Sequence, residues 1–263
     1  MTNESKALAT RADIPAHLAN LKPEGLEELA AYQQLQRLKV VQGMTDADLR
    51  REFPVGSLVL SPERTLVAKP RETAEATLLY FWPSWEKWAD INDAEAGGRP
   101  LASSTDPASD VARKARDFDA RKEAYPDNTD KRQWFHRHVE SLNFALMIDT
   151  GPAAGAVAVL PYNRGSHKFG ARLCGYLKRR AVPIYANRIE LVTKELPSPV
   201  GKGTYEVVDW RGAENPFASA DRLPLLKQTF DGFAKAHGSK TLAYAEEAAH
   251  GDEGEMGDDR DPT

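Results

Sequence analysis

The sequence predicts a mainly β fold with helices at both ends. Apolar segments of strand length dominate the middle of the chain. A single amphipathic pattern of helical period, beginning at Ser166, interrupts them, and helically spaced leucine and phenylalanine residues flank them on either side. Together these observations indicate an α+β protein whose core is a sheet.

The N-terminal part predicts an arm followed by two helices. Residues 1–23 show no periodicity and are expected to form a flexible arm. In residues 24–42 leucines recur near helical spacing, and Gly43 is a natural stop, so a helix is expected. Residues 45–52 begin with a threonine cap followed by acids in the first turn, which predicts a short second helix.

The next part predicts strands, a loop and a charged helix. Residues 57–68 and 76–82 are β-like, with Pro62 at a turn or bulge. Residues 97–110 are rich in Gly, Ser, Pro and Asp, which predicts a loop. Residues 111–123 are highly charged and predict an exposed helix.

A hairpin and an amphipathic helix are expected next. Residues 139–148 and 155–160 are apolar runs of strand length, and residues 149–152 between them are typical of a hairpin connection. From Ser166 the period changes to that of a helix with two different sides. The apolar side carries Phe169, Leu173, Tyr176 and Leu177, and the basic side carries Lys168, Arg172 and Arg179.

The last predicted elements are two strands and a closing helix. Residues 184–194 and 204–210 predict a hairpin, and residues 221–236 predict a helix. The side chains expected to point inward from that helix are Leu225, Leu226, Thr229, Phe230 and Phe233. Strands, then a helix, then two more strands is the order of an OB-fold, in which the helix closes one end of a small barrel. The fold class expected is therefore an OB-fold-like barrel with N-terminal and C-terminal helices.

This reading divides the chain into four parts. The division is a flexible arm at 1–23, a helical extension at 24–53, an OB-fold-like domain at 54–237 that contains a charged insertion at 93–130, and a disordered acidic tail at 238–263.

Composition excludes several classes of protein. The chain has 263 residues, 41% of them hydrophobic and 28% charged, which suits a globular protein. Its single cysteine, Cys174, forms no intrachain disulfide and no cysteine-rich zinc site. No apolar run is long enough for a membrane span, and the N-terminus lacks the apolar core of a signal peptide. A cytoplasmic location is therefore expected, without a membrane partner.

The net charge of −4 conceals a strong asymmetry along the chain. Residues 246–263 hold eight acids and one arginine, a local sum of −7. Residues 160–202 hold nine lysines and arginines and two acids, a local sum of +7. The chain is thus a basic body with an acidic tail, which indicates an anionic partner.

No enzyme motif stands out. The sequence has no phosphate-binding loop, no nucleophile elbow, no HExxH zinc helix and no dinucleotide-binding glycine fingerprint. Cys174 on a helix is more often inert core than a nucleophile. His136 and His138 have the spacing of a metal-binding pair but no third ligand nearby, so surface or hydrogen-bonded histidines are the better interpretation. We expect neither catalysis nor a cofactor nor a metal.

Interleaved cations and rings are the most informative feature. A single-stranded nucleic acid offers phosphates to cations and base faces to flat rings. The expected phosphate contacts are Arg164, Lys168, Arg172, Lys178, Arg179, Arg180 and Arg188. The candidate stacking rings are Trp82, Trp85, Trp88, Trp134, Tyr162 and Tyr185, of which two to four are expected to stack. For any single ring, burial in the core is the commoner fate.

The acidic tail has two interpretations. One is a solvated extension that aids solubility. The other is a segment that competes for the basic surface and docks other proteins. The residues that would serve such docking are Asp252, Glu253, Glu255, Asp258, Asp259 and Asp261.

Several segments resemble bacteriophage single-stranded DNA-binding proteins of the OB-fold class. They are residues 144–148, 158–160, 169–180, 183–186 and 203–205, with the aromatic stretch 78–88 upstream, and the resemblance covers about residues 55–236. It implies a protein of the bacterial host cytoplasm that coats single strands during replication and recombination and recruits partners through its acidic C-terminus. Three features depart from the pattern: the charged insertion, the helical N-terminal extension, and a tail that ends without the terminal phenylalanine common in such proteins.

The function expected is sequence-independent binding of single-stranded DNA, without catalysis. The alternatives are a metal-dependent nuclease or other nucleic-acid enzyme, and an interaction protein that binds no nucleic acid. DNA and RNA remain equal candidates, because backbone cations and stacking rings serve both.

Overall fold

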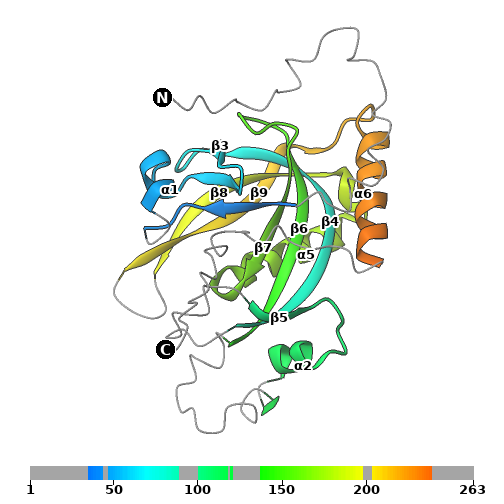
Figure 1. Ribbon diagram of the computed structural model, residues 1–263. Coiled ribbons are helices and arrows are strands. Elements are labelled where there is room, and N and C mark those ends of the chain that lie inside the picture. Colours follow the sequence, from blue (N-terminus) through cyan, green and yellow to red (C-terminus); the bar gives the residue numbers. More distant parts are fainter. Residues whose placement is uncertain are drawn as a thin grey trace, which may run out of the picture. The chain divides into compact units, whose positions relative to one another are not determined.

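The structure, a computed structural model, describes residues 35–43, 47–88, 100–117, 119–120, 137–197 and 203–238. Contacts divide the chain into residues 1–33 and 34–263, and every described residue belongs to the second unit. In this unit nine described strands form one curled sheet in the order β3-β2-β1-β7-β6-β4-β8-β9, with β5 paired to β4 (Figure 1). The prediction of a mainly β protein with helices at its flanks is confirmed for the described part.

The centre of the sheet is an antiparallel meander of three strands. β4 (Ala74–Trp88) pairs with β6 (His138–Ile148), and β6 pairs with β7 (Val157–Asn163). The predicted hairpin between β6 and β7 is confirmed. Consecutive residues such as Leu78 and Leu79 are both buried. Since successive side chains of a strand point to opposite faces, both faces of the meander are covered.

Helix α5 (His167–Arg180) covers one face of the meander, as its predicted apolar side requires. Phe169 and Leu173 are buried there, in the main core cluster. Gly170 permits the close approach of helix and strand, because a Cβ at this position would lie 2.7 Å from the Cβ of Tyr162 on β7. The residue with the smallest side chain thus stands where the helix crosses the strand.

The two strands predicted after this helix are also observed. β8 (Asn187–Pro197) follows a 3-10 helix, η5 (Ile184–Ala186), and pairs antiparallel with β9 (Thr204–Phe217). β8 also pairs antiparallel with β4. Strands, then a helix, then two more strands, as expected from the sequence, are therefore present in the described part of the chain, where seven strands rather than the three of an OB-fold precede α5.

Helix α6 (Leu223–Gly238) covers the other face of the meander and stands beside β4 and β6 (Figure 1). Leu226 and Phe233 are buried in a second core cluster with Trp82 of β4. The prediction that Leu225 also points inward is wrong: this residue is 57% exposed. Leu225 and Leu226 are neighbours on a helix that buries only one side, so only one of them reaches the core.

The N-terminal part of the sheet corrects one prediction. β1 (Gln36–Val40) pairs antiparallel with β2 (Leu58–Ser61) and parallel with β7, so a helix through residues 24–42 is wrong at its C-terminal end. Hydrogen-bonding partners on both sides override the helical spacing of the leucines. Residues 24–34 lie outside the described part. The short helix α1 (Ala47–Glu52) and the strand β3 (Thr65–Ala68) are as predicted.

A second correction concerns the predicted loop at residues 97–110. Within it, β5 (Pro100–Ser104) pairs antiparallel with the distal end of β4. The serine-rich and proline-containing composition is typical of a loop, but an edge strand tolerates proline and polar side chains. The pairing comes from the unusual length of β4, which extends beyond the region that α5 and α6 cover.

The charged helix predicted at residues 111–123 is observed as α2 (Asp110–Arg116). The prediction that this helix is exposed is wrong on one side. Ala112 and Ala115 are buried in a small cluster with Trp85. Two small side chains on one side of α2 thus let the helix lie against the ring.

Candidate nucleic-acid interface

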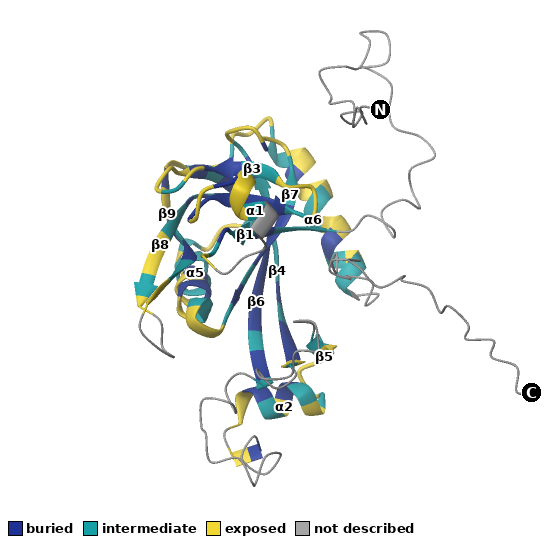
Figure 2. Ribbon diagram, turned by 60° about the vertical axis from the view of Figure 1, so that its left-hand side comes forward, coloured by how far each residue is buried: buried dark blue, intermediate teal, exposed yellow. Residues whose placement is uncertain are grey.

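One surface of the described chain gathers cations from two elements. The basic side of α5 carries Lys168, Arg172 and Arg179, and β8 contributes Lys194; these four side chains are called here the α5 basic face. All four residues are exposed. Figure 2 shows the exposed turns of α5 near the exposed end of β8. The spacing of i, i+4 and i+11 places the three α5 residues on one stripe, as predicted.

Three of these cations converge on one buried ring. Lys168 Nζ, the Arg172 guanidinium carbon and Lys194 Nζ lie 5.3, 5.4 and 5.9 Å from the centroid of Phe169. The attraction between a cation and an aromatic face partly offsets the repulsion among the three charges. Phe169 itself is buried, so it orients the cations and offers no face to a ligand.

Arg172 is held in a fixed position. Its guanidinium donates to the Asp209 carboxylate and, over 3.0 Å, to the carbonyl oxygen of Trp210 on β9. It also lies 4.8 Å from the centre of the Trp210 ring. The Trp210 indole in turn donates to the carbonyl oxygen of Phe169 over 2.9 Å. These contacts join α5 to β9 and leave one side of Arg172 open to solvent.

The charges of the α5 basic face are not balanced by acids. Asp209 pairs with Arg172, whereas Lys168, Arg179 and Lys194 have no ion pair within the described residues. The exposed Lys178 of α5 is likewise without an ion pair there. A surface of this kind attracts anions, and the attraction does not depend on the sequence of a polymeric ligand.

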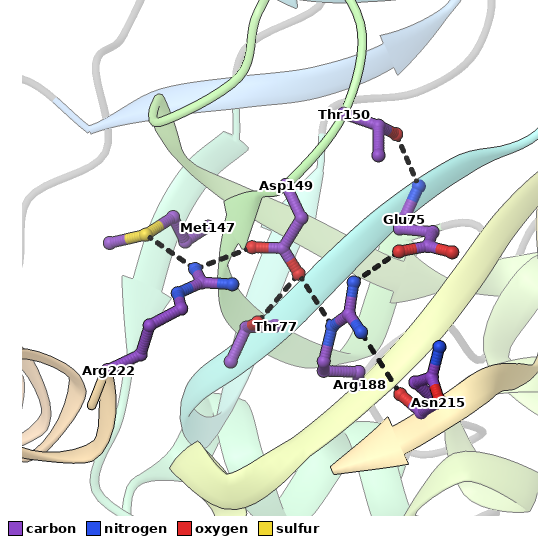
Figure 3. Close-up of polar contacts among 8 residues, drawn as sticks. All are labelled: Glu75, Thr77, Met147, Asp149, Thr150, Arg188, Asn215 and Arg222. Carbon is purple, nitrogen blue, oxygen red and sulfur yellow. Dashed lines mark hydrogen bonds and ion pairs between the residues drawn. The ribbon is translucent and has the colours of Figure 1, made fainter. Parts of the chain in front are cut away.

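Arg188 does not belong to this face, because its guanidinium is engaged within the protein. Its guanidinium donates to Asp149 over 3.2 Å, to Glu75 and to the carbonyl oxygen of Asn215 (Figure 3). Asp149 also accepts from Arg222, which precedes α6, over 2.7 Å. Arg188 is thus committed to a buried network that joins β4, β6, β8, β9 and the start of α6.

Three of the predicted stacking rings are core residues. Trp82 and Trp85 are each 2% exposed, and Tyr162 is fully buried. Burial raises the pKa of the Tyr162 hydroxyl. Trp85 donates to Glu140 over 3.1 Å, and the Arg116 guanidinium covers its ring at 4.1 Å. None of the three offers a face to a base, because both sides of the sheet are covered at these positions.

Trp88, a predicted stacking ring, and Arg164, a predicted phosphate contact, lie against each other. Arg164, in the 3-10 helix η4 (Arg164–Ser166), lies 4.7 Å from the centre of the half-buried Trp88 ring. The Trp88 indole donates to Glu86 over 2.9 Å. The ring of Trp88 and the guanidinium of Arg164 therefore each have a partner within the protein.

The remaining predicted residues are placed as follows. Tyr185 is half-buried and lies 5.4 Å from Phe230 of α6, ring centre to ring centre. Arg180 covers Phe217, at the end of β9, with its guanidinium 4.3 Å from the ring centre. Trp134 and the tail residues Asp252, Glu253, Glu255, Asp258, Asp259 and Asp261 lie outside the described residues.

One charged cluster beside α5 is not part of the basic face. Glu140 on β6 contacts His167, the first residue of α5, with Oε2 and Nε2 3.1 Å apart. The hydrogen bonds from His167 and Trp85 hold the pKa of Glu140 below its usual range.

Among the described residues no group of three or more His, Cys, Asp or Glu is arranged to hold a metal ion. Burial raises the pKa of the Cys174 thiol, which disfavours a reactive thiolate.

The structure adds two residues that sequence reasoning missed. Lys194 joins the basic face from β8, where an alternating strand pattern gave no sign that it would meet α5. Phe217 lies seven residues beyond the predicted strand 204–210, and only the greater length of β9 brings it to α5.

No helix in the described part of the chain is long and apolar enough to cross a membrane.

No family model, no curated protein and no solved structure matches this chain.

Proposed function

We propose that this protein binds single-stranded nucleic acid through the α5 basic face, without catalysis. The observation that carries the proposal is the gathering of Lys168, Arg172 and Lys194 around one ring, where Asp209 is their one ion-pair partner among the described residues. Since phosphates are the recurring feature of every nucleic-acid strand, a fixed group of cations binds them whatever the base sequence.

The path of the chain supports this proposal. An OB-fold is a partly open five-stranded barrel, a common scaffold for single-strand binding. Here β4, β6 and β7 form the meander, with β5 and α2 between β4 and β6 along the chain. Helix α5 and the hairpin β8-β9 come next, and β8 returns to pair with β4. The arrangement departs from that scheme where β1 pairs with β7 and the sheet path ends at β9.

The burial of three predicted rings changes the expected balance of forces. With Trp82, Trp85 and Tyr162 in the core, phosphate contacts carry most of the affinity. Binding should therefore weaken steeply with salt. It should also alter the fluorescence of Trp82 and Trp85 little, so a labelled strand is the better probe.

The biological setting follows from the resemblance stated above and is part of the proposal. The protein would coat single strands in a phage-type replication or recombination system. Its acidic tail, with a local charge of −7 over residues 246–263, would compete with nucleic acid for the α5 basic face or dock partner proteins.

The test is a titration of the full chain into a fluorescein-labelled oligo(dT), followed by anisotropy at low and high salt. We expect binding that weakens as salt rises, and tighter binding by a chain that ends at Ala245. A labelled duplex of the same length should bind more weakly. Loss of the labelled strand with magnesium, prevented by chelation, would instead indicate a nuclease, and no binding at any salt would indicate an interaction protein.

A further inference from the structure

Phe217 is the one exposed aromatic ring among the residues that the structure describes. It is 49% exposed, whereas the other described tryptophan, tyrosine and phenylalanine residues are buried or half-buried. A single exposed apolar residue is common on a protein surface, so what matters is the group that lies against this ring and the way its backbone is held.

A cation from α5 lies against this ring. The Arg180 guanidinium carbon is 4.3 Å from the centre of Phe217 and 5.0 Å from that of Tyr176. Arg180 also donates to the Tyr176 hydroxyl, which fixes its orientation. The guanidinium covers one face of Phe217, so the exposed area of the ring lies on its remaining surface.

The backbone that carries Phe217 is held in place. Phe217 pairs with Asn187 across the β8-β9 ladder, and the next residue, Ala218, donates from its backbone to the carbonyl oxygen of Ala186 over 3.0 Å. The Asn187 side chain donates to the carbonyl oxygens of Pro183 and Ile184 over 2.9 and 3.2 Å. The ring is thus presented from a fixed position rather than from a mobile loop.

We infer that Phe217 and Arg180 form a platform on which one nucleobase of the bound strand stacks. The inference rests on the proposed function and specifies a base contact that the α5 basic face lacks. Arg180 is the last residue of α5, and Arg179, which has no ion pair with another described residue, precedes it. A strand that follows the cations of α5 therefore reaches the ring at the end of the helix. A flat, polarisable base is the ligand that matches an exposed ring backed by a guanidinium.

The experiment compares two strands and two matched variants. The strands are labelled oligo(dT) and a strand of equal length with abasic sites, which keeps the phosphates and lacks bases. The variants are Phe217→Ala and Leu225→Ala, the latter an exposed apolar residue on α6 at 57% exposure. Phe217→Leu is added because it keeps apolar bulk without a planar ring, and Phe217→Trp because it restores one.

Stacking predicts a specific pattern. Phe217→Ala and Phe217→Leu should weaken oligo(dT) binding about 5- to 150-fold, the range of one base-ring stack. Both should leave binding of the abasic strand within about twofold, as should Leu225→Ala on either strand. Phe217→Trp should retain oligo(dT) binding, and quenching of its fluorescence, beyond that of the wild type, should accompany it.

Equal effects on both strands, or none on oligo(dT), would overturn the platform. In that case salt-dependent binding of oligo(dT) by the wild type would still support the proposed function. Failure of the wild type to bind either strand would reject the proposed function itself. The two failures are thus distinguishable in one series of titrations.

Discussion

Replacement of Asp149 by asparagine should strongly destabilise the protein. The Asp149 side chain is 3% exposed and accepts from Thr77 over 2.7 Å, from Arg188 over 3.2 Å and from Arg222 over 2.7 Å. Asparagine has nearly the same shape but no charge. The variant therefore removes one charge from a network of two guanidinium groups and two carboxylates, the second being that of Glu75.

The size of the effect follows from this burial. Breaking a buried ion pair from one side costs about 3 to 5 kcal/mol, because the remaining charge is left without compensation. The Arg188 and Arg222 side chains are 16% and 32% exposed, so water compensates part of the loss. We expect a decrease of about 3 kcal/mol in the free energy of unfolding, the lower end of that range. For a domain of this size the midpoint of thermal unfolding should fall by about 6 to 12 °C.

Urea unfolding followed by circular dichroism measures this difference. The matched control is Glu190→Gln, which breaks the pair between Glu190 and Arg211 on the surface of the same sheet. Because the Arg211 side chain is 65% exposed, this variant should cost at most about 1 kcal/mol. Equal effects of Asp149→Asn and Glu190→Gln would refute the view that the network is a buried structural unit.

Three further outcomes are expected. Gly170→Ala should destabilise by about 1 to 3 kcal/mol in urea unfolding, because its Cβ would meet Tyr162 at 2.7 Å. Gly232→Ala in α6, where a Cβ has no neighbour within 4 Å, should stabilise by about 0.5 to 1 kcal/mol; the opposite order would contradict the close packing of α5. Glu140→Gln tests the lowered pKa of Glu140. A carboxyl with a lowered pKa stabilises the fold above its unfolded value, about 4.3, and this stability is lost as pH falls through the folded pKa. The stability difference between wild type and Glu140→Gln should therefore be larger at about pH 6 than at about pH 3, and a constant difference would exclude the effect. Arg188→Met should leave the salt dependence of oligo(dT) binding unchanged, since the Arg188 charge is paired within the fold. A smaller slope of log affinity against log salt would show that Arg188 contacts phosphate.

Much of the sheet could be predicted because a strand that is buried on both faces contains runs of consecutive apolar residues, which are recognisable in the sequence. β6 ends in the apolar run 144–148, and a turn separates it from β7, so length and composition were sufficient. α5 could be predicted because its period differs from that of the strands around it. β1 could not: five residues containing one buried leucine fit a helix equally well, and only the pairing with β2 and β7 decides.

The candidate site was predictable in part for a related reason. Helical spacing placed Lys168, Arg172 and Arg179 together, since neighbours on a helix surface follow from sequence distance alone. The ion pair of Arg188 with Asp149 spans 39 residues and depends on the sheet, so no local pattern shows it. Trp82 is a ring in a strand covered on both faces, and composition alone does not distinguish such a ring from a surface platform.

The most direct test of the account is the salt dependence of oligo(dT) binding by Lys168→Gln/Lys194→Gln. These two lysines have no ion pair in the described part of the chain, so their replacement leaves no acid without its partner. Replacement of Arg172, by contrast, would leave Asp209 unpaired. The control, Lys69→Gln/Lys227→Gln, removes the same charge from two exposed lysines outside α5, of which Lys227 forms a surface ion pair with Asp231. The account predicts that the slope of log affinity against log salt falls by about 1.4 for the first variant and stays constant for the control. Equal slopes in both variants would contradict the assignment of the α5 basic face.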